Sequence, residues 1–188
     1  MQARPERPTI AQIREISQPP SVTGRSNAEH WIADLYLRKI SPYVTRVLLR
    51  TPITANGVTW LMILVGASIG PALLIQGWFG IALALLLSHK QMLIDCCDGE
   101  VARWRNTKSP MGIFLDKLGH YGAESLIPIC FGLRLADWPN QPITSSIYPY
   151  LGALLSVLII INKALNDAVH VARAFSGLPK LEDTKGVN

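Results

Sequence analysis

The chain has 188 residues, of which 49% are hydrophobic, and its formal net charge is +5 at pH 7. This length suits one domain, and the apolar residues fall in long runs, so the chain need not build a water-facing globule. The basic balance does not indicate nucleic acid binding, because most Lys and Arg residues lie beside the apolar runs and form no patch with interleaved aromatic residues.

The first part of the chain comprises a polar tail and an amphipathic segment. Residues 1–27 are polar and rich in Pro and Arg, which predicts a disordered or loosely attached cytoplasmic tail. Residues 28–49 predict an amphipathic helix at the membrane surface, broken around Pro42, with basic residues toward its far end. An ordinary surface helix packed on protein is the alternative. The expected apolar face consists of Trp31, Ile32, Leu35 and Tyr36.

Four apolar runs follow, at about 58–76, 78–101, 112–135 and 147–168. Each is close to the 20 or so residues that a helix needs to cross the hydrocarbon core. The second and third runs carry too many polar groups to face lipid all round, so their charged faces are expected to point inward. The chain is therefore predicted to be an all-α integral membrane protein with about four transmembrane helices. Its membrane domain spans residues 28–170, and a cytoplasmic tail follows at 171–188.

The distribution of Lys and Arg predicts the orientation. Eight of them precede the first run, three lie between the second and third runs, and three lie in the C-terminal tail. The two alternate loops contain only Arg134. By the positive-inside rule, both termini and the loop after the second run are expected to face the cytoplasm.

Carboxylates interrupt the apolar pattern where the second run ends and the third begins. Asp95 and Asp98 lie three residues apart near the end of the second run, so they share a helix face. Gly112, Asp116 and His120 are spaced by four and form one face at the start of the third run. The loop between the runs is short, so we expect two antiparallel neighbouring helices whose polar faces meet.

Carboxylates in such surroundings need compensating charge. A charged side chain at mid-membrane costs about 2.5–3.5 kcal/mol on the milder scale, so three unpaired carboxylates would cost on the order of 8 kcal/mol. Arg103 and Lys117 would neutralise part of this charge, and one or two divalent cations would neutralise more. Glu100 points away from the Asp95 face and is expected to be solvated. The pattern therefore favours a metal site built from acids of both helices.

The stretch from Asp95 to His120 resembles a known family signature. Its pattern is Asp95-x-x-Asp98-Gly99-x-x-Ala102-Arg103, eight residues, and then Gly112-x-x-x-Asp116-x-x-x-His120. This is similar to the signature of the CDP-alcohol phosphotransferases, also called CDP-alcohol phosphatidyltransferases, which ends in Asp where this chain has His120. Upstream, the stretch TPITANGVTW resembles the family's opening of the first span, with Pro52 displaced and Asn56 and Thr59 in place. The resemblance covers roughly residues 28–136.

The resemblance implies an integral membrane enzyme, usually a six-span homodimer. Such enzymes transfer a substituted phosphoryl group from a CDP-alcohol to an acceptor hydroxyl and release CMP, in phospholipid or related polar-lipid synthesis. It implies two divalent ions, Mg²⁺ or Mn²⁺, with Asp95, Asp98, Asp116 and His120 as candidate ligands. It places Asp116 and His120 among the catalytic residues, with His120 at the position of the general base. The nucleotide would lie against Gly99, Ala102, Arg103 and Gly112, with hydrogen bonds from Asn56 and Thr59.

Two departures from the family keep alternatives open. His120 replaces a carboxylate, so it is a base, a metal ligand or an inactivating change. Only four spans are visible where the family usually has six, so the chain is either a shortened member or part of a longer product. A non-catalytic relative that binds nucleotide or partners is one alternative function, and an ion carrier is another. The donor is CDP-diacylglycerol or a small CDP-alcohol such as CDP-inositol.

Overall fold

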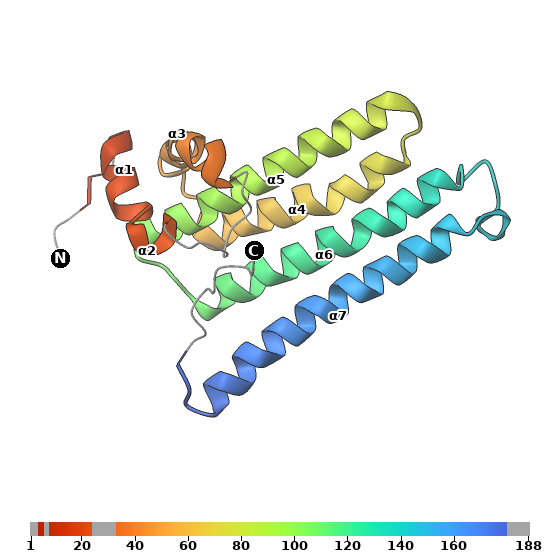
Figure 1. Cartoon of the computed structure of the whole chain (residues 1–188). Helices are drawn as coiled ribbons and strands as arrows, with labels where there is room; N and C mark the ends of the chain where they lie inside the picture. The colour runs from red at the N-terminus through yellow and green to blue at the C-terminus, as the bar shows by residue number, and fades with distance from the viewer. Residues whose placement is uncertain (1–3, 6–7, 24–32, 180–188) are drawn as a thin grey trace. The chain divides into compact units, whose positions relative to one another are not determined.

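The computed structural model describes residues 4–5, 8–23 and 33–179, and every regular element in these ranges is helical. The N-terminal part contains α1 (Ile10–Ser17), α2 (Pro20–Thr23) and a π-helical segment (Ala33–Leu37) that continues into α3 (Arg38–Leu48). Four long helices follow (Figure 1): α4 (Ala55–Leu74), α5 (Gly77–Arg105), α6 (Pro110–Leu135) and α7 (Tyr148–Phe175). A short 3₁₀ turn (Ile143–Ser145) precedes α7. The predicted all-α class is confirmed.

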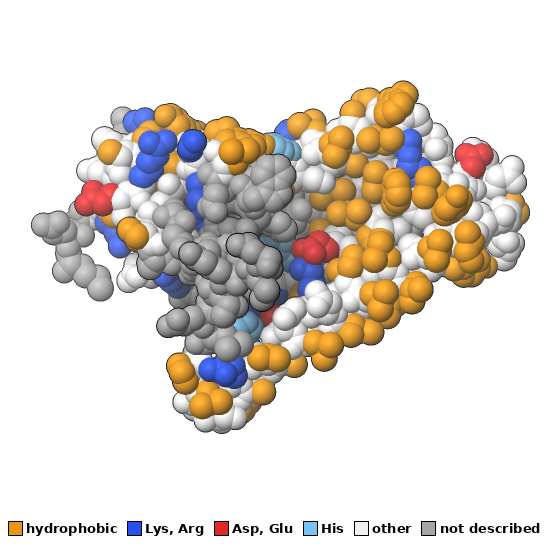
Figure 2. Space-filling view, in the orientation of Figure 1, with side chains coloured by type: hydrophobic (Ala, Val, Ile, Leu, Met, Phe, Trp, Pro, Cys, Tyr) orange, Lys and Arg blue, Asp and Glu red, His pale blue; other side chains and the backbone are white. Residues whose placement is uncertain are grey.

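Three of the described helices, α4, α5 and α7, are long and apolar enough to cross a membrane, which supports the predicted membrane fold. The surface of α7 is largely apolar, and Figure 2 shows hydrophobic side chains along its length. Helix α6 has 26 residues, but its sequence includes acidic and basic side chains and does not meet the same criterion of composition. Its role as a fourth span therefore stays a prediction.

Contacts divide the chain into two compact units. Among the described residues, the first unit comprises residues 4–5, 8–23, 33–62 and 90–116, and the second comprises residues 63–89 and 117–179. Each unit has its own buried apolar cluster. In the first, residues of α4 and α5 pack together: Ala55, Val58, Cys97 and Val101. In the second, residues of α4, α5 and α6 do so: Ile69, Ala72, Leu73, Ala84 and Cys130.

The described part of the predicted N-terminal tail contains a short helix, α1. Thr9 and Gln12 form a capping box at the start of this helix, which satisfies backbone donors that the first turn leaves free. Ile13 and Ser17 are fully buried. The Ser17 hydroxyl donates to the Glu100 carbonyl of α5 at 3.1 Å. A polar composition therefore did not exclude order, because tertiary contacts with α5 hold the segment.

Helix α3 passes through Pro42, where the sequence predicted a break. Proline has no backbone N–H, so the carbonyl four residues earlier loses its helical donor. That carbonyl belongs to Arg38, and the Gln18 side chain donates to it at 2.8 Å. The Lys39 carbonyl accepts from Arg14 at 3.1 Å. The Gln18 contact thus replaces the one helical bond that Pro42 removes, and the Arg14 contact connects α1 to the same turn of α3. Residues 28–32 of the predicted surface helix lie outside the described residues.

The described part of α3 has two faces of different chemistry. Leu37, just before the helix, and Ser41 and Thr45 within it are buried. Large apolar side chains on the other face are exposed: Ile40, Tyr43 and Val47. An exposed apolar stripe on a helix with basic residues is what a membrane-surface helix needs. The prediction of such a helix is therefore compatible with α3, although Leu35 and Tyr36 precede the helix proper.

In the second unit, Arg134 caps the end of α4. Its guanidinium donates to the carbonyls of Leu73 (2.8 Å), Ile75 (2.5 Å) and Gly77 (2.7 Å). The Leu73 and Ile75 carbonyls lie at the end of α4 and in the turn that follows, where helical donors run out, and Gly77 is the first residue of α5. Gly77 has φ +79°, which suits a tight reversal. Arg134, in the last turn of α6, therefore has a structural role.

Helices α6 and α7 pack closely through two glycines. A Cβ on Gly132 would lie 2.4 Å from the Tyr148 carbonyl oxygen, and one on Gly152 would lie 2.3 Å from that of Pro128. Only the absence of a side chain permits this approach. The two helices lie side by side in the second unit, as Figure 1 shows. This packing brings the polar residues near their middle into contact.

Candidate metal and nucleotide site

A four-residue turn joins α5 to α6 and sets the register of the acidic residues. Asn106 has φ 55°, a left-handed conformation that Asn tolerates better than most residues. The Ser109 hydroxyl accepts a hydrogen bond from the Gly112 N–H at 3.1 Å, and Pro110 follows as the first helical residue. This is the N-terminal chemistry that helices favour. The short reversal that the sequence predicted is therefore present.

The turn brings acids of the two helices together. Asp95 of α5 and Asp116 of α6 each offer a carboxylate oxygen, and these oxygens lie within 4.8 Å of each other. His120 lies one turn beyond Asp116 on α6, with a ring nitrogen within the same distance of the Asp116 oxygen. All three side chains are partly buried. Three of the four predicted metal ligands thus form one group of potential donor atoms.

The chemistry of this donor set fits a hard divalent cation. Carboxylate oxygens are the protein ligands that Mg²⁺ prefers, at about 2.1 Å, so two oxygens on one ion can lie at most about 4.2 Å apart. The 4.8 Å limit requires only a small side-chain adjustment to reach that geometry. A neutral imidazole nitrogen is an additional donor that Mn²⁺ accepts more readily than Mg²⁺. The residues present are therefore suited to bind the metal ions that the sequence predicted.

Asp98 is held separately, by a hydroxyl of α4. The Thr59 Oγ1 donates to the Asp98 Oδ2 at 2.7 Å and also lies 3.2 Å from the Ala55 carbonyl oxygen. Thr59 is only 3% exposed. The sequence placed Thr59 against the nucleotide, but in the structure its hydroxyl contacts the carboxylate of a predicted metal ligand. Its position is that of a residue that orients Asp98.

The predicted nucleotide residues lie around two glycines. A Cβ on Gly99 would lie 2.8 Å from an Nη atom of Arg103, so the missing side chain leaves room for the guanidinium. A Cβ on Gly112 would lie 3.2 Å from the Asn56 Oδ1, which places Asn56 beside the start of α6. Ala102 packs against the apolar cluster of the first unit. The structure thus pairs Asn56 with Gly112, and Arg103 with Gly99.

Arg103 also contacts the N-terminal segment. Its Nε donates to the Ser17 carbonyl at 2.5 Å, and its own carbonyl accepts from Arg4 at 2.7 Å. The Arg4 guanidinium lies 5.9 Å from the centroid of the Trp104 ring, within the range of a cation–π contact. Signature residues at the end of α5 are therefore supported by the first residues of the chain, which the sequence did not predict.

The expectation that Glu100 is solvated was wrong, because Glu100 is fully buried. Its Oε1 accepts from Gln18 at 2.7 Å and from Ser41 at 2.5 Å, and its Oε2 accepts from Thr45 at 2.6 Å. The carboxylate does point away from the Asp95 face, toward α3 and the end of α1. A buried carboxylate requires such donors. Glu100 therefore anchors the N-terminal helices on the helix that carries Asp95 and Asp98.

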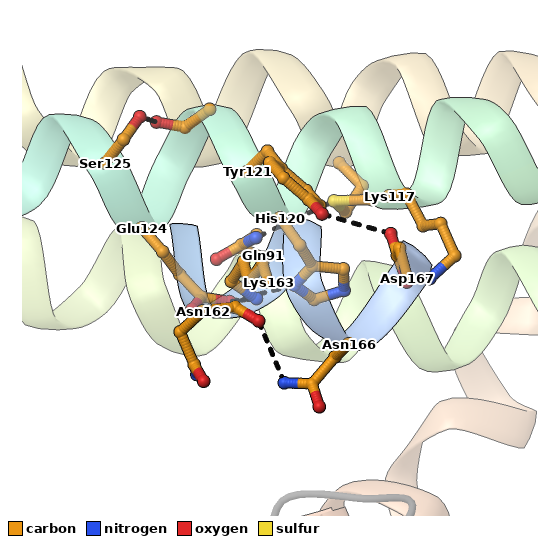
Figure 3. Close-up of polar contacts among 12 residues, drawn as sticks. Gln91, Lys117, His120, Tyr121, Glu124, Ser125, Asn162, Lys163, Asn166 and Asp167 are labelled. Carbon is orange, nitrogen blue, oxygen red and sulfur yellow. Dashed lines mark hydrogen bonds and ion pairs between the residues drawn. The ribbon is translucent and has the colours of Figure 1, made fainter. Parts of the chain in front are cut away.

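A second polar group joins α6 to α7, as Figure 3 shows. Lys117 of α6 forms an ion pair with Asp167 of α7, and the Tyr121 hydroxyl donates to Asp167 at 3.1 Å. One turn further, Lys163 of α7 forms a 2.8 Å ion pair with Glu124 of α6. The sequence assigned Lys117 to neutralising the acidic group, but the structure shows its ion pair with Asp167.

Sequence reasoning did not identify Glu124, although the signal was present. Glu124 follows His120 by four residues, and its Oε1 lies 3.6 Å from the His120 Nδ1. This spacing puts two side chains on one helix face. The pattern was missed because Glu124 lies beyond the signature.

Comparison with known protein families identifies a match for this chain. The sequence profile of the family described as CDP-alcohol phosphatidyltransferase matches residues 52–166. A comparison with curated proteins finds no match. The matched segment begins just before α4 and ends within α7, so it includes the acidic group and all of the polar group between α6 and α7 except Asp167.

Proposed function

The chain belongs to the CDP-alcohol phosphatidyltransferase family, and from this premise we propose that it is a membrane transferase that uses a CDP-alcohol donor. It transfers the substituted phosphoryl group to an acceptor hydroxyl and releases CMP, in phospholipid or related polar-lipid synthesis. The observation that carries the proposal is the approach of Asp95 and Asp116, whose oxygens lie within 4.8 Å although the residues come from different helices. The donor is CDP-diacylglycerol or a small CDP-alcohol such as CDP-inositol.

The acids of the signature would hold the metal ions. Asp95 and Asp116 are the core ligands of this proposal, with Asp98 oriented by Thr59 and with His120 beside Asp116. Two divalent ions, Mg²⁺ or Mn²⁺, would offset negative charge on the donor's pyrophosphate and on the departing CMP. The nucleotide would lie over Gly99 and Gly112, near Asn56, Ala102 and Arg103. The space beside Gly99 holds the Arg103 guanidinium, and the space beside Gly112 adjoins the Asn56 amide, so two of the proposed nucleotide contacts lie close to these glycines.

His120 is proposed as the general base. The acceptor oxygen forms a bond to the phosphorus that carries the alcohol, and the bridging P–O bond to CMP breaks, with its electron pair leaving on CMP. The acceptor's hydroxyl proton moves to a ring nitrogen of His120. A neutral imidazole has one protonated nitrogen and one nitrogen with a free lone pair. That lone pair can accept the proton or bind a metal ion, but it cannot do both at once. The Asp116 carboxylate, one turn away, would stabilise the imidazolium that forms.

Orientation and assembly complete the proposal. Eight basic residues precede the first predicted span, so both termini and the acidic group are proposed to face the cytoplasm. Arg134, the exception among the alternate loops, is engaged with carbonyls at the end of α4. A homodimer is proposed from the family.

A screen of purified full-chain protein against CDP-alcohol donors and hydroxyl acceptors, with CMP release as the readout, tests this function. Asp95→Asn, Asp98→Asn and Asp116→Asn should each abolish metal-dependent CMP release while leaving membrane insertion intact. Asp137→Asn is the matched control, because Asp137 is exposed in the loop before α7 and Asn also tolerates its φ of 54°.

The outcomes separate three classes of protein. CMP release that survives EDTA would contradict the metal-dependent mechanism. Nucleotide binding without CMP release would favour a non-catalytic relative. Ion flux into vesicles that depends on the same acids, without nucleotide binding, would favour a carrier.

A further inference from the structure

His120 has a carboxylate partner one helical turn beyond it. The Glu124 Oε1 lies 3.6 Å from the His120 Nδ1, and both residues belong to α6. This distance exceeds a hydrogen bond of about 2.7–3.2 Å by a few tenths of an ångström, so a small rotation of either side chain would close it. Figure 3 shows both side chains between α6 and α7.

Glu124 is itself held in place from α7. The Lys163 Nζ lies 2.8 Å from the same Oε1 atom, and it lies 5.8 Å from the centroid of the Tyr121 ring. A carboxylate and an ammonium between apolar helices are costly unless they are paired. The pairing restricts the rotamers of Glu124, so the oxygen that faces His120 has a defined position.

An ion pair that only joined α6 to α7 would not need to place its carboxylate beside His120. Lys117 and Asp167 already join α6 to α7 one turn away, with Tyr121 as a second donor to Asp167. The Lys163–Glu124 pair differs because its oxygen also approaches an imidazole nitrogen. A carboxylate that accepts from one ring N–H fixes the tautomer and the orientation of the ring.

We propose that Glu124, held by Lys163, is a positioning residue that keeps His120 in the tautomer with the proton on Nδ1. The lone pair on Nε2 is then the one offered to the acceptor's proton or to a metal ion. An Asp at position 120 would need no such partner, because a carboxylate has no tautomers. The catalytic consequence rests on the proposed function, whereas the tautomer itself does not.

Nitrogen NMR of the full chain labelled with ¹⁵N-histidine, in detergent and with EDTA, measures the tautomer directly. The sample is kept well above the ordinary imidazole pKa of about 6.5, and His120→Asn assigns the signals. The wild type should show the proton on Nδ1. Glu124→Leu should give a mixture of tautomers, whereas Glu124→Gln, which keeps an acceptor oxygen, should preserve much of the bias.

Two further variants separate positioning from packing. Lys163→Met removes the ion pair with Glu124 while keeping the side-chain length, and it should weaken the tautomer bias. If Glu124→Leu does not fold, Lys163→Met tests whether the held Glu124 carboxylate sets the tautomer. Asp167→Asn weakens the neighbouring α6–α7 contact without touching His120, and it should leave the tautomer unchanged. A wild-type ring that is doubly protonated, or protonated on Nε2, would overturn the proposal. So would equal effects of Asp167→Asn and Glu124→Leu, or no effect of Glu124→Leu.

Kinetics test the catalytic consequence. Glu124→Leu should lower kcat for CMP release by about 10–100-fold, the usual effect of removing a partner behind a functional histidine, while KM for the donor changes little. Glu124→Gln should recover part of the rate. Unchanged kcat in Glu124→Leu, with an altered tautomer, would refute the catalytic role. If the wild type releases no CMP from any donor, the proposed function fails, and the tautomer measurement still decides whether Glu124 positions His120.

Discussion

Replacing Glu100 by Ala tests whether one buried carboxylate holds the N-terminal helices on α5. Three side chains, those of Gln18, Ser41 and Thr45, donate to this carboxylate over 2.5–2.7 Å. Each buried donor that loses its acceptor costs about 1–3 kcal/mol, so the three together cost roughly 3–9 kcal/mol. Water that enters the vacated space would reduce this loss. We therefore expect the segment to lose at least about 3 kcal/mol of stability.

Hydrogen exchange of the full chain in detergent measures this loss locally. A loss of 3 kcal/mol corresponds to roughly 150-fold more frequent opening, which should appear in amides of α1 and α3. Amides of α7 should be unaffected, because α7 belongs to the other compact unit. Glu15→Ala is the matched control, since Glu15 is an exposed acid on α1.

A double-mutant cycle with Ser41→Ala sharpens the result. The two substitutions remove both ends of one hydrogen bond, so their combined cost should be smaller than the sum of the single costs. Unchanged exchange of α1 and α3 in Glu100→Ala would refute the reasoning, because the network would then contribute nothing to holding these helices.

Three further outcomes follow from contacts near the site and at the end of α4. Thr59→Val removes the hydroxyl that holds Asp98, and it should weaken Mn²⁺ affinity by about 10–100-fold in a metal titration. Gly99→Ala places a Cβ 2.8 Å from the Arg103 guanidinium, so KM for the CDP-alcohol should rise while the thermal unfolding temperature changes little. Arg134→Gln removes hydrogen bonds to three carbonyls and should destabilise the chain by about 1–3 kcal/mol in thermal unfolding, since two of the bonds are exposed.

Each of these substitutions has a matched control. Thr59→Ser keeps the hydroxyl and should bind the metal normally. Gly122→Ala adds a Cβ in open space on α6 and should leave KM unchanged. Arg134→Lys keeps the charge but loses the several N–H donors of the planar guanidinium. It should therefore restore only part of the stability that Arg134→Gln loses. Equal behaviour of a variant and its control would contradict the contact on which that prediction depends.

The main features of the fold could be predicted from local sequence. Long apolar runs predict helices whatever their partners are, because a helix satisfies its own backbone hydrogen bonds. The same holds for the α5–α6 reversal, where Ser109 and Pro110 carry their own helix-starting chemistry. Spacing of three and four along single helices also sufficed to place Asp95, Asp116 and His120 in one group.

The sequence was least informative where a side chain's contacts depend on a residue far away in the chain, and the expectation for Glu100 was wrong for this reason. Glu100 was expected to be solvated because it is charged, but its donors lie 55 to 82 residues earlier. No spacing rule shows that the Thr59 hydroxyl reaches Asp98, 39 residues later, and its role at the nucleotide stays a prediction of the resemblance. Residues 1–27 were expected to be disordered or loosely attached, and composition does not report that α1 within them contacts another helix.

The sequence by itself determined the helical class, the membrane-compatible helices and the acidic signature, because these depend on periodicity and composition within single helices. Only the tertiary structure decided which polar side chains are partners: Glu100 with the N-terminal helices, Thr59 with Asp98, and Lys163 with Glu124 beside His120. The physical reason is that a hydrogen bond or ion pair acts over about 3 Å in space. Distance along the chain carries no information about such pairs once they come from different helices.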